Sequence, residues 1–373
     1  MSFDIERYRS RIEESRRRIE IASRFEEPDR VPIAISVAGS FYCALLGYDI
    51  GTYYTDLDQQ IDVQLRGQEW AFEALQDDRT GAAIHLDIGP VAEGILFDCE
   101  IVRPKGTSPW IAHRIHDIPD IERLEVPDPA THPGVQEVYR RGEQLRAEVE
   151  RRGIRLPAGG GFGGIHPPLS AACALADPAL IYEWMYTEPA WIKVLFDKLF
   201  EAYCRCVDHN AERSGHAVES IGLCDDNSAF VSNEMYRKSV YPYNKAIYDR
   251  YGAKGRYLHA DGPNDHHFAM YADDMKITRM DIGGFSDIAA AKAAMHGKTV
   301  ISGGLNCRDL YGDFESARPA VDRAIRIGAP GGGYILAVGG ETYAGVNPDT
   351  LIRVVEYAKQ IGRYPIAAGR GSR

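Results

Sequence analysis

His259 and Asp261 are the two ionisable residues whose types and spacing point most clearly to chemistry. They stand two residues apart at the end of an apolar segment, GRYLHA (255–260). In an extended strand such residues point to the same side, so the imidazole and the carboxylate can face one ligand, either a metal ion or a substrate proton. Both are usual Zn²⁺ ligands, and a third ligand has to come from another strand. A turn at Asp261-Gly262-Pro263 is the alternative that explains Asp261 without chemistry.

The third ligand is expected near the other strand ends. Asp225 and Asp226 directly follow an apolar segment, AVESIGLC (217–224). Adjacent carboxylates repel each other, so at least one of them should face a cation, a hydrogen-bond donor or solvent, and both are candidate catalytic residues. Helix capping by one, with the other solvated, is the alternative. Glu219 and Cys307 are the remaining candidate metal ligands.

Further polar residues follow other apolar segments. His85 and Asp87 share one face of a strand, where they either serve the chemistry or form a buried histidine–carboxylate pair. The loop GGGFGGIHPP (159–168) matches neither the P-loop nor the GxGxxG spacing, but its backbone can approach a flat ligand or an anion closely. The candidate substrate-binding residues are therefore His85, Asp87, His166, Asn227 and Asn306.

Eight short apolar segments alternate with helical ones and would position these residues. The predicted strands are VPIAIS (31–36), AAIHLD (82–87), IRLPAGG (154–160), AVESIGLC (217–224), GRYLHA (255–260), ITRMDI (277–282), KTVISGG (298–304) and GYILAV (333–338). Near-continuous apolar strands separated by helices indicate parallel strands covered on both faces. The pattern predicts an α/β fold, a (β/α)8 TIM barrel, with a doubly wound open sheet as the alternative. In a barrel the chemistry lies where the strands end.

The intervening segments predict long helices. Helical patterns occupy 134–153, 188–215, 232–252, 286–297 and 308–328. We expect one domain over residues 1–373, in which residues 1–30 form an N-terminal helical extension. Its basic run, Arg16-Arg17-Arg18, stands among glutamates and predicts a solvated helix face with charge pairs.

Composition excludes several classes of function. Lys+Arg 43 against Asp+Glu 54 gives 43 − 54 = −11, and this acidic balance argues against nucleic acid or an anionic membrane surface as the main partner. No apolar run approaches the ~20 residues of a membrane span, and the N-terminal MSFDIERYRSR is polar, so we expect a cytoplasmic protein. Seven cysteines without a CxxC pair fit reduced thiols.

Four segments of the C-terminal half carry a family resemblance, namely CDDNSAFVSNEMYRKSVYPY (224–243), YLHADG (257–262), DIGGFSDIAAAK…GKTVISGGLN (281–306) and APGGGYILAVGGETYAGVNPDTLIRVVEYAKQIGRYP (329–365). They resemble the uroporphyrinogen decarboxylase superfamily, which includes corrinoid-linked methyltransferases as well as the haem-pathway decarboxylase. In the first half, PDRVPIAI and the GGGFGG loop also fit. The resemblance covers most of the chain and implies a (β/α)8 barrel.

The chain departs from the motifs of both branches. Decarboxylases of this superfamily carry an arginine-rich segment similar to RQAGR after the first strand. The corresponding segment here, SVAGSFYCALLG, contains no arginine. Thiol-activating methyltransferases of this superfamily carry an HxC motif and a later GC dipeptide. The corresponding positions here are His259-Ala260-Asp261 and Gly339-Gly340, so both cysteines are missing. Relatives that take a methyl group from an ether, an alcohol or a similar compound are more varied in their ligands. His259, Asp261 and one of the acids Glu219, Asp225 or Asp226 suit that pattern.

The resemblance implies a methyltransferase that demethylates a small methylated substrate and passes the methyl group to a corrinoid protein. Zinc would act as a Lewis acid on the heteroatom that carries the methyl group. No DxHxxG pattern is present, so the corrinoid would come on a separate partner, and a homodimer is expected by analogy. In a metal-free version His259, oriented by Asp261, protonates the leaving oxygen. The alternatives are a carboxy-lyase acting on a tetrapyrrole, with His259 or Tyr343 handling protons, and a non-catalytic barrel that binds a tetrapyrrole or corrinoid.

Overall fold

The computed structural model describes residues 3–366 and contains a parallel sheet of five strands. In spatial order these are β5 (Ser220–Cys224), β6 (Gly255–His259), β7 (Arg279–Asp281), β8 (Val300–Leu305) and β9 (Tyr334–Val338). Parallel bridges from Ile33 to Leu336 and from Val37 to Thr342 add the segment 33–37 beside β9. Two further strands, β1 (Ile84–His85) and β4 (Ala158–Gly159), form a separate parallel pair.

All eight predicted strand segments contain strand or bridge pairing, and the mixed α/β class is confirmed. The pairing does not close into an eight-stranded ring. Within residues 3–366, no ladder joins the segment 33–37 to β1 or joins β4 to β5. An antiparallel hairpin, β2 (Ile101–Val102) with β3 (Trp110–Ile111), was not predicted.

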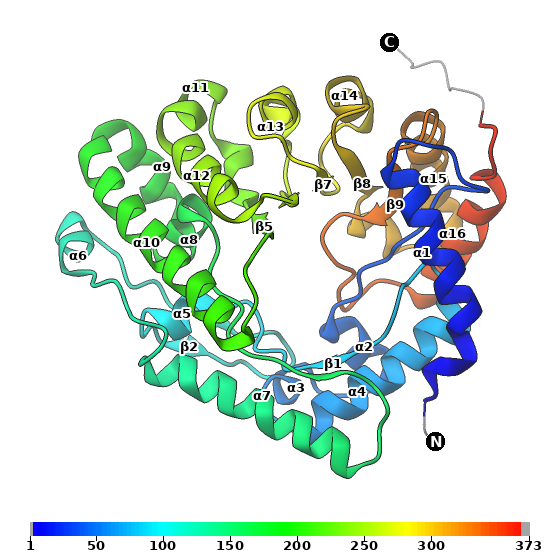
Figure 1. The fold of residues 1–373 in the computed structure, drawn as a ribbon, viewed down its shortest axis with the longest axis horizontal. Helices are drawn as coiled ribbons and strands as arrows, with labels where there is room; N and C mark the ends of the chain where they lie inside the picture. Colours follow the sequence, from blue (N-terminus) through cyan, green and yellow to red (C-terminus); the bar gives the residue numbers. More distant parts are fainter. Residues whose placement is uncertain (1–2, 367–373) are drawn as a thin grey trace.

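The helices follow one another around an arc (Figure 1), from α4 and α7 through α10, α13 and α14 to α15 and α16 beside α1. Their bounds in chain order are α1 (Arg9–Ser23), α2 (Gly39–Leu46), α3 (Ile50–Tyr53), α4 (Leu57–Trp70), α5 (Ala92–Leu96), α6 (Ile118–Arg123), α7 (Pro133–Arg151), α8 (Pro168–Leu175), α9 (Pro178–Thr187), α10 (Pro189–Ser214), α11 (Asn233–Met235), α12 (Tyr241–Tyr251), α13 (Phe268–Asp273), α14 (Ile288–Met295), α15 (Phe314–Gly328) and α16 (Pro348–Ile361). The predicted helices correspond to α7, α10, α11 with α12, α14 and α15. Within the described part of the chain, no helix is both long and apolar enough to cross a membrane.

The predicted solvated face of the N-terminal helix α1 is confirmed for Arg16 and Arg17, which are exposed, but not for Arg18. Arg18 is mostly buried, and its Nη1 lies 2.6 Å from Oδ1 of Asp78, whose side chain is only 2% exposed. Arg30 binds the same carboxylate, with Nη1 2.6 Å from Oδ2. Arg18 therefore fastens α1 to the rest of the fold, which the charge pattern of this segment did not indicate.

Glutamine side chains take the place of a neighbouring strand along the free edge of β1. Three glutamines spaced four residues apart lie on one face of α4. Each side-chain amide donates to the carbonyl and accepts from the N–H of a single residue. The pairs are Gln68 with Ala83, Gln64 with His85 and Gln60 with Asp87, at distances between 2.6 and 3.1 Å.

Carboxylates satisfy the facing edge of the segment 33–37 in the same way. Asp78 Oδ2 accepts from the N–H of Ile33 at 2.8 Å, and Asp77 Oδ2 accepts from the N–H of Ile35 at 2.9 Å. Partly buried backbone groups need partners, and here side chains supply them. The segment 33–37 and β1 can therefore stay apart, which leaves room between them for a cavity.

Replacing Gln60 with leucine tests this substitution of side chain for strand. The change leaves the N–H and the carbonyl of Asp87 without partners, so we expect a loss of about 2–4 kcal/mol of unfolding free energy. The measurement is urea denaturation followed by circular dichroism. Gln59→Leu is the control, because Gln59 makes a single side-chain bond, to the carbonyl of Asp49, and should cost less than about 1.5 kcal/mol. Equal losses in the two variants would contradict this role of Gln60.

Candidate metal centre

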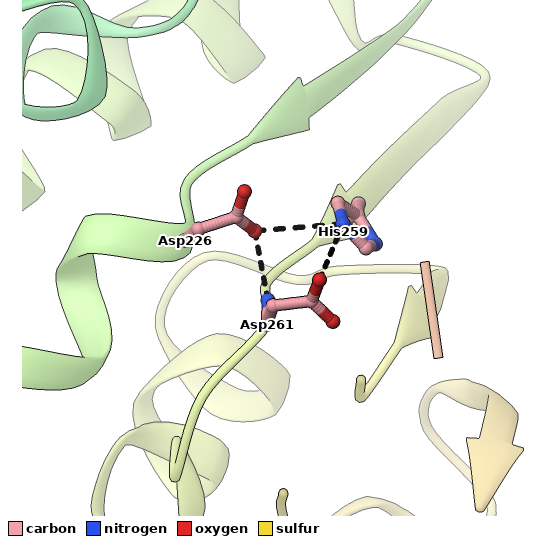
Figure 2. A group of neighbouring side chains, drawn as sticks. All are labelled: Asp226, His259 and Asp261. Carbon is pink, nitrogen blue, oxygen red and sulfur yellow. Dashed lines mark hydrogen bonds and ion pairs between the residues drawn. The ribbon is translucent and has the colours of Figure 1, made fainter. Parts of the chain in front are cut away.

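Asp226, His259 and Asp261 converge at the carboxyl ends of β5 and β6 (Figure 2). Asp226 begins the short 3-10 helix η3 (Asp226–Phe230) after β5, and His259 is the last residue of β6. The ladder pairs Cys224 with His259 and His259 with Asp281, so the strand ends lie at one level. Parallel register therefore brings Asp226 close to His259 and Asp261, which follow it by 33 and 35 residues along the chain.

The spacing of the three side chains fits one small cation. The Nε2 atom of His259 lies 3.5 Å from Oδ1 of Asp226 and 3.8 Å from Oδ2 of Asp261. One ligand atom from each residue lies within 4.8 Å of the others. Ligands held 2.0–2.1 Å from a tetrahedral Zn²⁺ are roughly 3.3 Å apart, so small side-chain movements suffice to close this set around an ion.

Asp281 fixes the orientation of His259 from the other side of the ring. Its Oδ2 lies 3.1 Å from Nδ1 of His259 and 3.2 Å from the N–H of Gly340, and its Oδ1 accepts from the N–H of Gly283 at 3.1 Å. A proton on Nδ1 then donates to Asp281 and leaves Nε2 with its lone pair toward Asp226 and Asp261. This is the carboxylate–histidine arrangement that supports metal ligands.

The surrounding charges alter the proton affinity of the site. Burial lowers the pKa of His259, but the hydrogen bond to Asp281 and the charges of Asp281, Asp226 and Asp261 outweigh it and raise the pKa to about 9. Burial also raises the pKa of Asp261, with His259 acting in the opposite direction. The group thus attracts one positive charge, which either a proton or a metal ion can supply.

Gly340 keeps the space beside this group open. Its φ of +67° lies in the left-handed region, and a Cβ there would sit 3.1 Å from Oδ2 of Asp261. Its N–H also binds Asp281. A side chain at this position would therefore be strained and would crowd the candidate ligand.

Asp225 points away from this group. Its side chain is fully buried, accepting from Ser170 Oγ at 3.0 Å and from Asn244 Nδ2 at 2.7 Å. Burial raises its pKa to about 6, while the bonds from Ser170 and Asn244 act in the opposite direction. Consecutive residues leaving a strand point to opposite sides, so only one member of the Asp225-Asp226 pair can face His259.

The structure does not bring Glu219 or Cys307 into the group. Glu219 precedes β5, at the opposite end of that strand from Asp226, and its Oε2 binds Lys254 Nζ at 2.5 Å. Cys307 starts a 3-10 turn after β8, with its thiol near Tyr311. The positions of Glu219 and Cys307 contradict their prediction as metal ligands. Asp226 instead completes the group with His259 and Asp261.

His85, Asp87 and Tyr343 line one cavity of about 810 Å³ between the segment 33–37 and β1. Tyr42, Tyr53 and Tyr54 contribute aromatic wall. A neighbouring cavity of about 740 Å³ shares four lining residues with it and is also lined by His259 and Asp281. The shared residues are Ser36, Arg79, Thr80 and Gly81. The candidate metal centre therefore adjoins space large enough for a small-molecule substrate.

His166 lies apart from that cavity, bound to a partner that the sequence did not reveal. The buried Glu93 accepts from the N–H of His166 at 2.7 Å and lies 2.8 Å from its Nδ1. Burial lowers the pKa of His166, but Glu93 outweighs this and raises it overall. With Gly163, Gly164 and Cys224, His166 lines a smaller cavity of about 260 Å³.

The two asparagines predicted to bind substrate are engaged in local structure. Asn227 Nδ2 lies 3.2 Å from the hydroxyl of Tyr182 in α9. Asn306 caps a 3-10 turn, with its Oδ1 accepting from the N–H of Arg308 at 2.9 Å and its Nδ2 donating to the carbonyl of Gly284 at 3.1 Å. Both positions follow strands, where turn and cap residues are common, and this accounts for them.

Sequence reasoning missed Asp281 and Glu93 as partners of the two histidines. Asp281 ends a predicted strand next to the one that carries His259, so its position at the rim was a usable signal. Glu93 lies in the short helix α5, and nothing in the local pattern pointed to His166.

Comparison with known proteins identifies the family of this chain. The model of the family "Uroporphyrinogen decarboxylase (URO-D)" matches residues 14–361, nearly the whole described chain. The chain belongs to the URO-D family. A uroporphyrinogen decarboxylase of Geobacillus thermodenitrificans is 28% identical over 286 residues, 74% of this chain and 77% of that protein. One of Chlorobium phaeobacteroides is 24% identical over 289 residues, 75% of this chain and 79% of that protein.

A solved structure of a methyltransferase has the same fold as this URO-D chain. The methyltransferase from Methanosarcina mazei superposes with a TM-score of 0.67 at 15% identity, covering 93% of this chain and 98% of that one. Members of the family are enzymes, and the names of these relatives fall into two reaction classes, decarboxylation and methyl transfer.

Proposed function

We propose that this chain is a metal-assisted methyltransferase that demethylates a small ether, alcohol or similar compound and passes the methyl group to a corrinoid protein. The observation that carries the proposal is the group of Asp226, His259 and Asp261, with His259 oriented by Asp281. Three ligands beside an open cavity are typical of a catalytic rather than a structural zinc site.

The residues present fit a zinc ion. Two carboxylates and one imidazole are among the usual ligand types, and three protein ligands leave the fourth position to a substrate atom. When bound, the ion supplies Lewis-acid polarisation of the heteroatom that carries the methyl group. The described site has no cysteine among its three ligands, which separates it from thiolate zinc sites.

This chain's own residues would bind and position the substrate. The cavity lined by His85, Asp87 and Tyr343 would hold its body next to His259. Burial, followed by the charge of Glu341, raises the pKa of Tyr343 to about 12, so its phenol keeps its proton at neutral pH and can donate to the departing heteroatom. The reduced corrinoid of the partner would supply the nucleophile that accepts the methyl group, and Tyr343 would supply the proton that the freed heteroatom takes up.

The main alternative is a carboxy-lyase acting on a tetrapyrrole. The names of the curated relatives favour it, whereas the absence of arginine from SVAGSFYCALLG and the His–Asp–Asp group favour methyl transfer. In a metal-free variant of either reaction, the raised pKa of His259 suits a general acid.

One assay distinguishes these reactions. Purified protein, zinc-loaded or chelator-treated, is incubated with cob(I)alamin and a panel of methyl ethers, methanol and methylamines, and formation of methylcobalamin is followed by absorbance. We expect methyl transfer only with the zinc-loaded protein. Loss of carboxylates from uroporphyrinogen, with no methyl transfer in the panel, would establish the carboxy-lyase instead.

Asp281→Asn tests the orienting role of Asp281 within this proposal. Loss of the charge that holds Nδ1 of His259 should weaken zinc binding by about 10–100-fold while the three ligands remain in place. Competition with a zinc-binding dye measures the affinity. Asp273→Asn, at a surface residue paired with Lys298, is the control. Unchanged affinity in Asp281→Asn would contradict the role.

A further inference from the structure

A buried arginine stands where the two large cavities meet. Arg79 lines both the cavity of about 810 Å³ and the cavity of about 740 Å³. The first cavity occupies the space between the segment 33–37 and β1, which the glutamines of α4 and the carboxylates of Asp77 and Asp78 keep open. The second cavity reaches His259. Arg79 therefore links the first cavity to the second one, which extends to the candidate metal centre.

The donors of Arg79 are incompletely used. Its side chain is 14% exposed, and its Nε donates to Oδ1 of Asp77 at 2.6 Å. Its Nη2 is buried out of contact with solvent and has no hydrogen-bond partner, so a ligand in the cavity can reach only the exposed part of the side chain. A guanidinium carries five N–H donors in a planar fork, and a buried donor left unpaired is costly. A carboxylate in the cavity would pair with the exposed part of the guanidinium through its charge.

Charge around Arg79 favours an anion at this end of the cavity. Asp78 already forms ion pairs with Arg18 and Arg30, so its single negative charge is neutralised by these two residues. Asp77 alone balances Arg79, and one of its oxygens is also taken by the N–H of Ile35. Burial disfavours the charged form of Arg79, yet Asp77 and Tyr42 raise its pKa overall, so it stays cationic.

The acidic residues of the cavity gather at its other end. Glu341 lines the same cavity, and the charged side chains that influence its pKa are Asp87, His259 and His85. Arg79 has Asp77 and Tyr42 as its neighbours. The cavity thus has an acidic end beside His259 and a cationic end at Arg79, with tyrosine side chains along its wall. Such a cavity orients a ligand that is anionic at one end only.

We propose that Arg79 binds the carboxylate of a small aromatic acid whose other end points toward His259. The tyrosine wall supplies the apolar and stacking surface for a ring. An ion pair between the guanidinium and the carboxylate supplies orientation. The inference rests on the proposed function only for which end of the acid reacts, since binding at Arg79 requires no metal.

Benzoate and its neutral analogue benzamide test the binding site. Their dissociation constants are measured by titration calorimetry on the chelator-treated full chain. Wild-type protein should bind benzoate at least about tenfold more tightly than benzamide, as expected of hydrogen bonds between charged groups. Asp77→Asn combined with Arg79→Met removes both charges together and should abolish the preference.

The double variant avoids leaving one buried charge unpaired, which would unfold the protein for an unrelated reason. Equal binding of benzoate and benzamide by wild-type protein, or a preference that survives in the double variant, would overturn the inference. Diffraction from wild-type crystals soaked in para-bromobenzoate needs no variant. The bromine signal should lie in the cavity with the carboxylate on Arg79, and a carboxylate placed elsewhere would overturn the inference. Zinc binding without a preference for benzoate would refute only this inference. A preference for benzoate without zinc binding would refute only the proposed function.

Discussion

Replacing His259 with alanine is expected to remove zinc from the purified protein. Wild-type protein prepared without chelator should carry about one zinc per chain, as a three-ligand site does. The variant loses the only nitrogen ligand of the group and leaves Asp226 and Asp261, two carboxylates that repel each other. We expect less than about 0.1 zinc per chain and a fall in methyl transfer of at least about 1,000-fold, comparable with removing a main source of electrostatic stabilisation. Elemental analysis and the cob(I)alamin assay measure the two effects.

His85→Ala is the matched control for His259→Ala. His85 lines the cavity that adjoins the site but is outside the Asp226, His259 and Asp261 group. Its variant should therefore retain zinc, whatever happens to turnover. Zinc that persists in His259→Ala, or that is lost equally in both variants, would contradict the assigned ligands. Absence of zinc from wild-type protein with intact activity would favour the metal-free acid–base mechanism.

Replacing Asp78 with alanine is expected to lower the unfolding free energy by about 3–5 kcal/mol, the cost of breaking a buried ion pair from one side. Asp78 accepts from Arg18, Arg30 and the N–H of Ile33, and its side chain is 2% exposed. The variant leaves two guanidinium groups facing each other at the edge of the segment 33–37. Urea denaturation followed by tryptophan fluorescence measures the loss.

Asp29→Ala removes a different partner of the same arginine. Asp29 binds Arg18 at 2.8 Å, but its side chain is 65% exposed, so the loss should stay within about 1 kcal/mol. Similar losses in Asp78→Ala and Asp29→Ala would show that burial does not strengthen the Asp78 network as argued. If Asp78→Ala does not fold, Asp78→Asn keeps an acceptor for the N–H of Ile33 and should show a smaller loss in the same direction.

The order of the secondary structure could be read from the sequence because it depends on local pattern. Apolar segments of strand length alternate with amphipathic segments of helix length, and each of the eight strand predictions falls on strand or bridge pairing. The candidate residues His259, Asp261 and Asp226 could be found for a related reason. Side chains at the carboxyl ends of parallel strands meet at one edge, whatever the details of packing.

Long-range partners could not be read in this way. The choice between Asp225 and Asp226 depends on which side of the chain faces the imidazole of His259. Asp225 instead accepts hydrogen bonds from Ser170 and Asn244. Glu219 was a reasonable ligand by type, but it stands at the wrong end of its strand. The link between Glu93 and His166 joins elements 73 residues apart with no shared pattern.

The sequence alone therefore determined the α/β class, the order of the strands and helices and the acidic and histidine side chains at the strand ends. Tertiary structure decided where the ring of strands stays open, because the glutamine side chains of α4 replace strand pairing along β1. It also decided that Asp281 orients His259 and that Arg79 borders the cavity. Local periodicity specifies which face a residue occupies, whereas the partner across a fold depends on how distant segments pack.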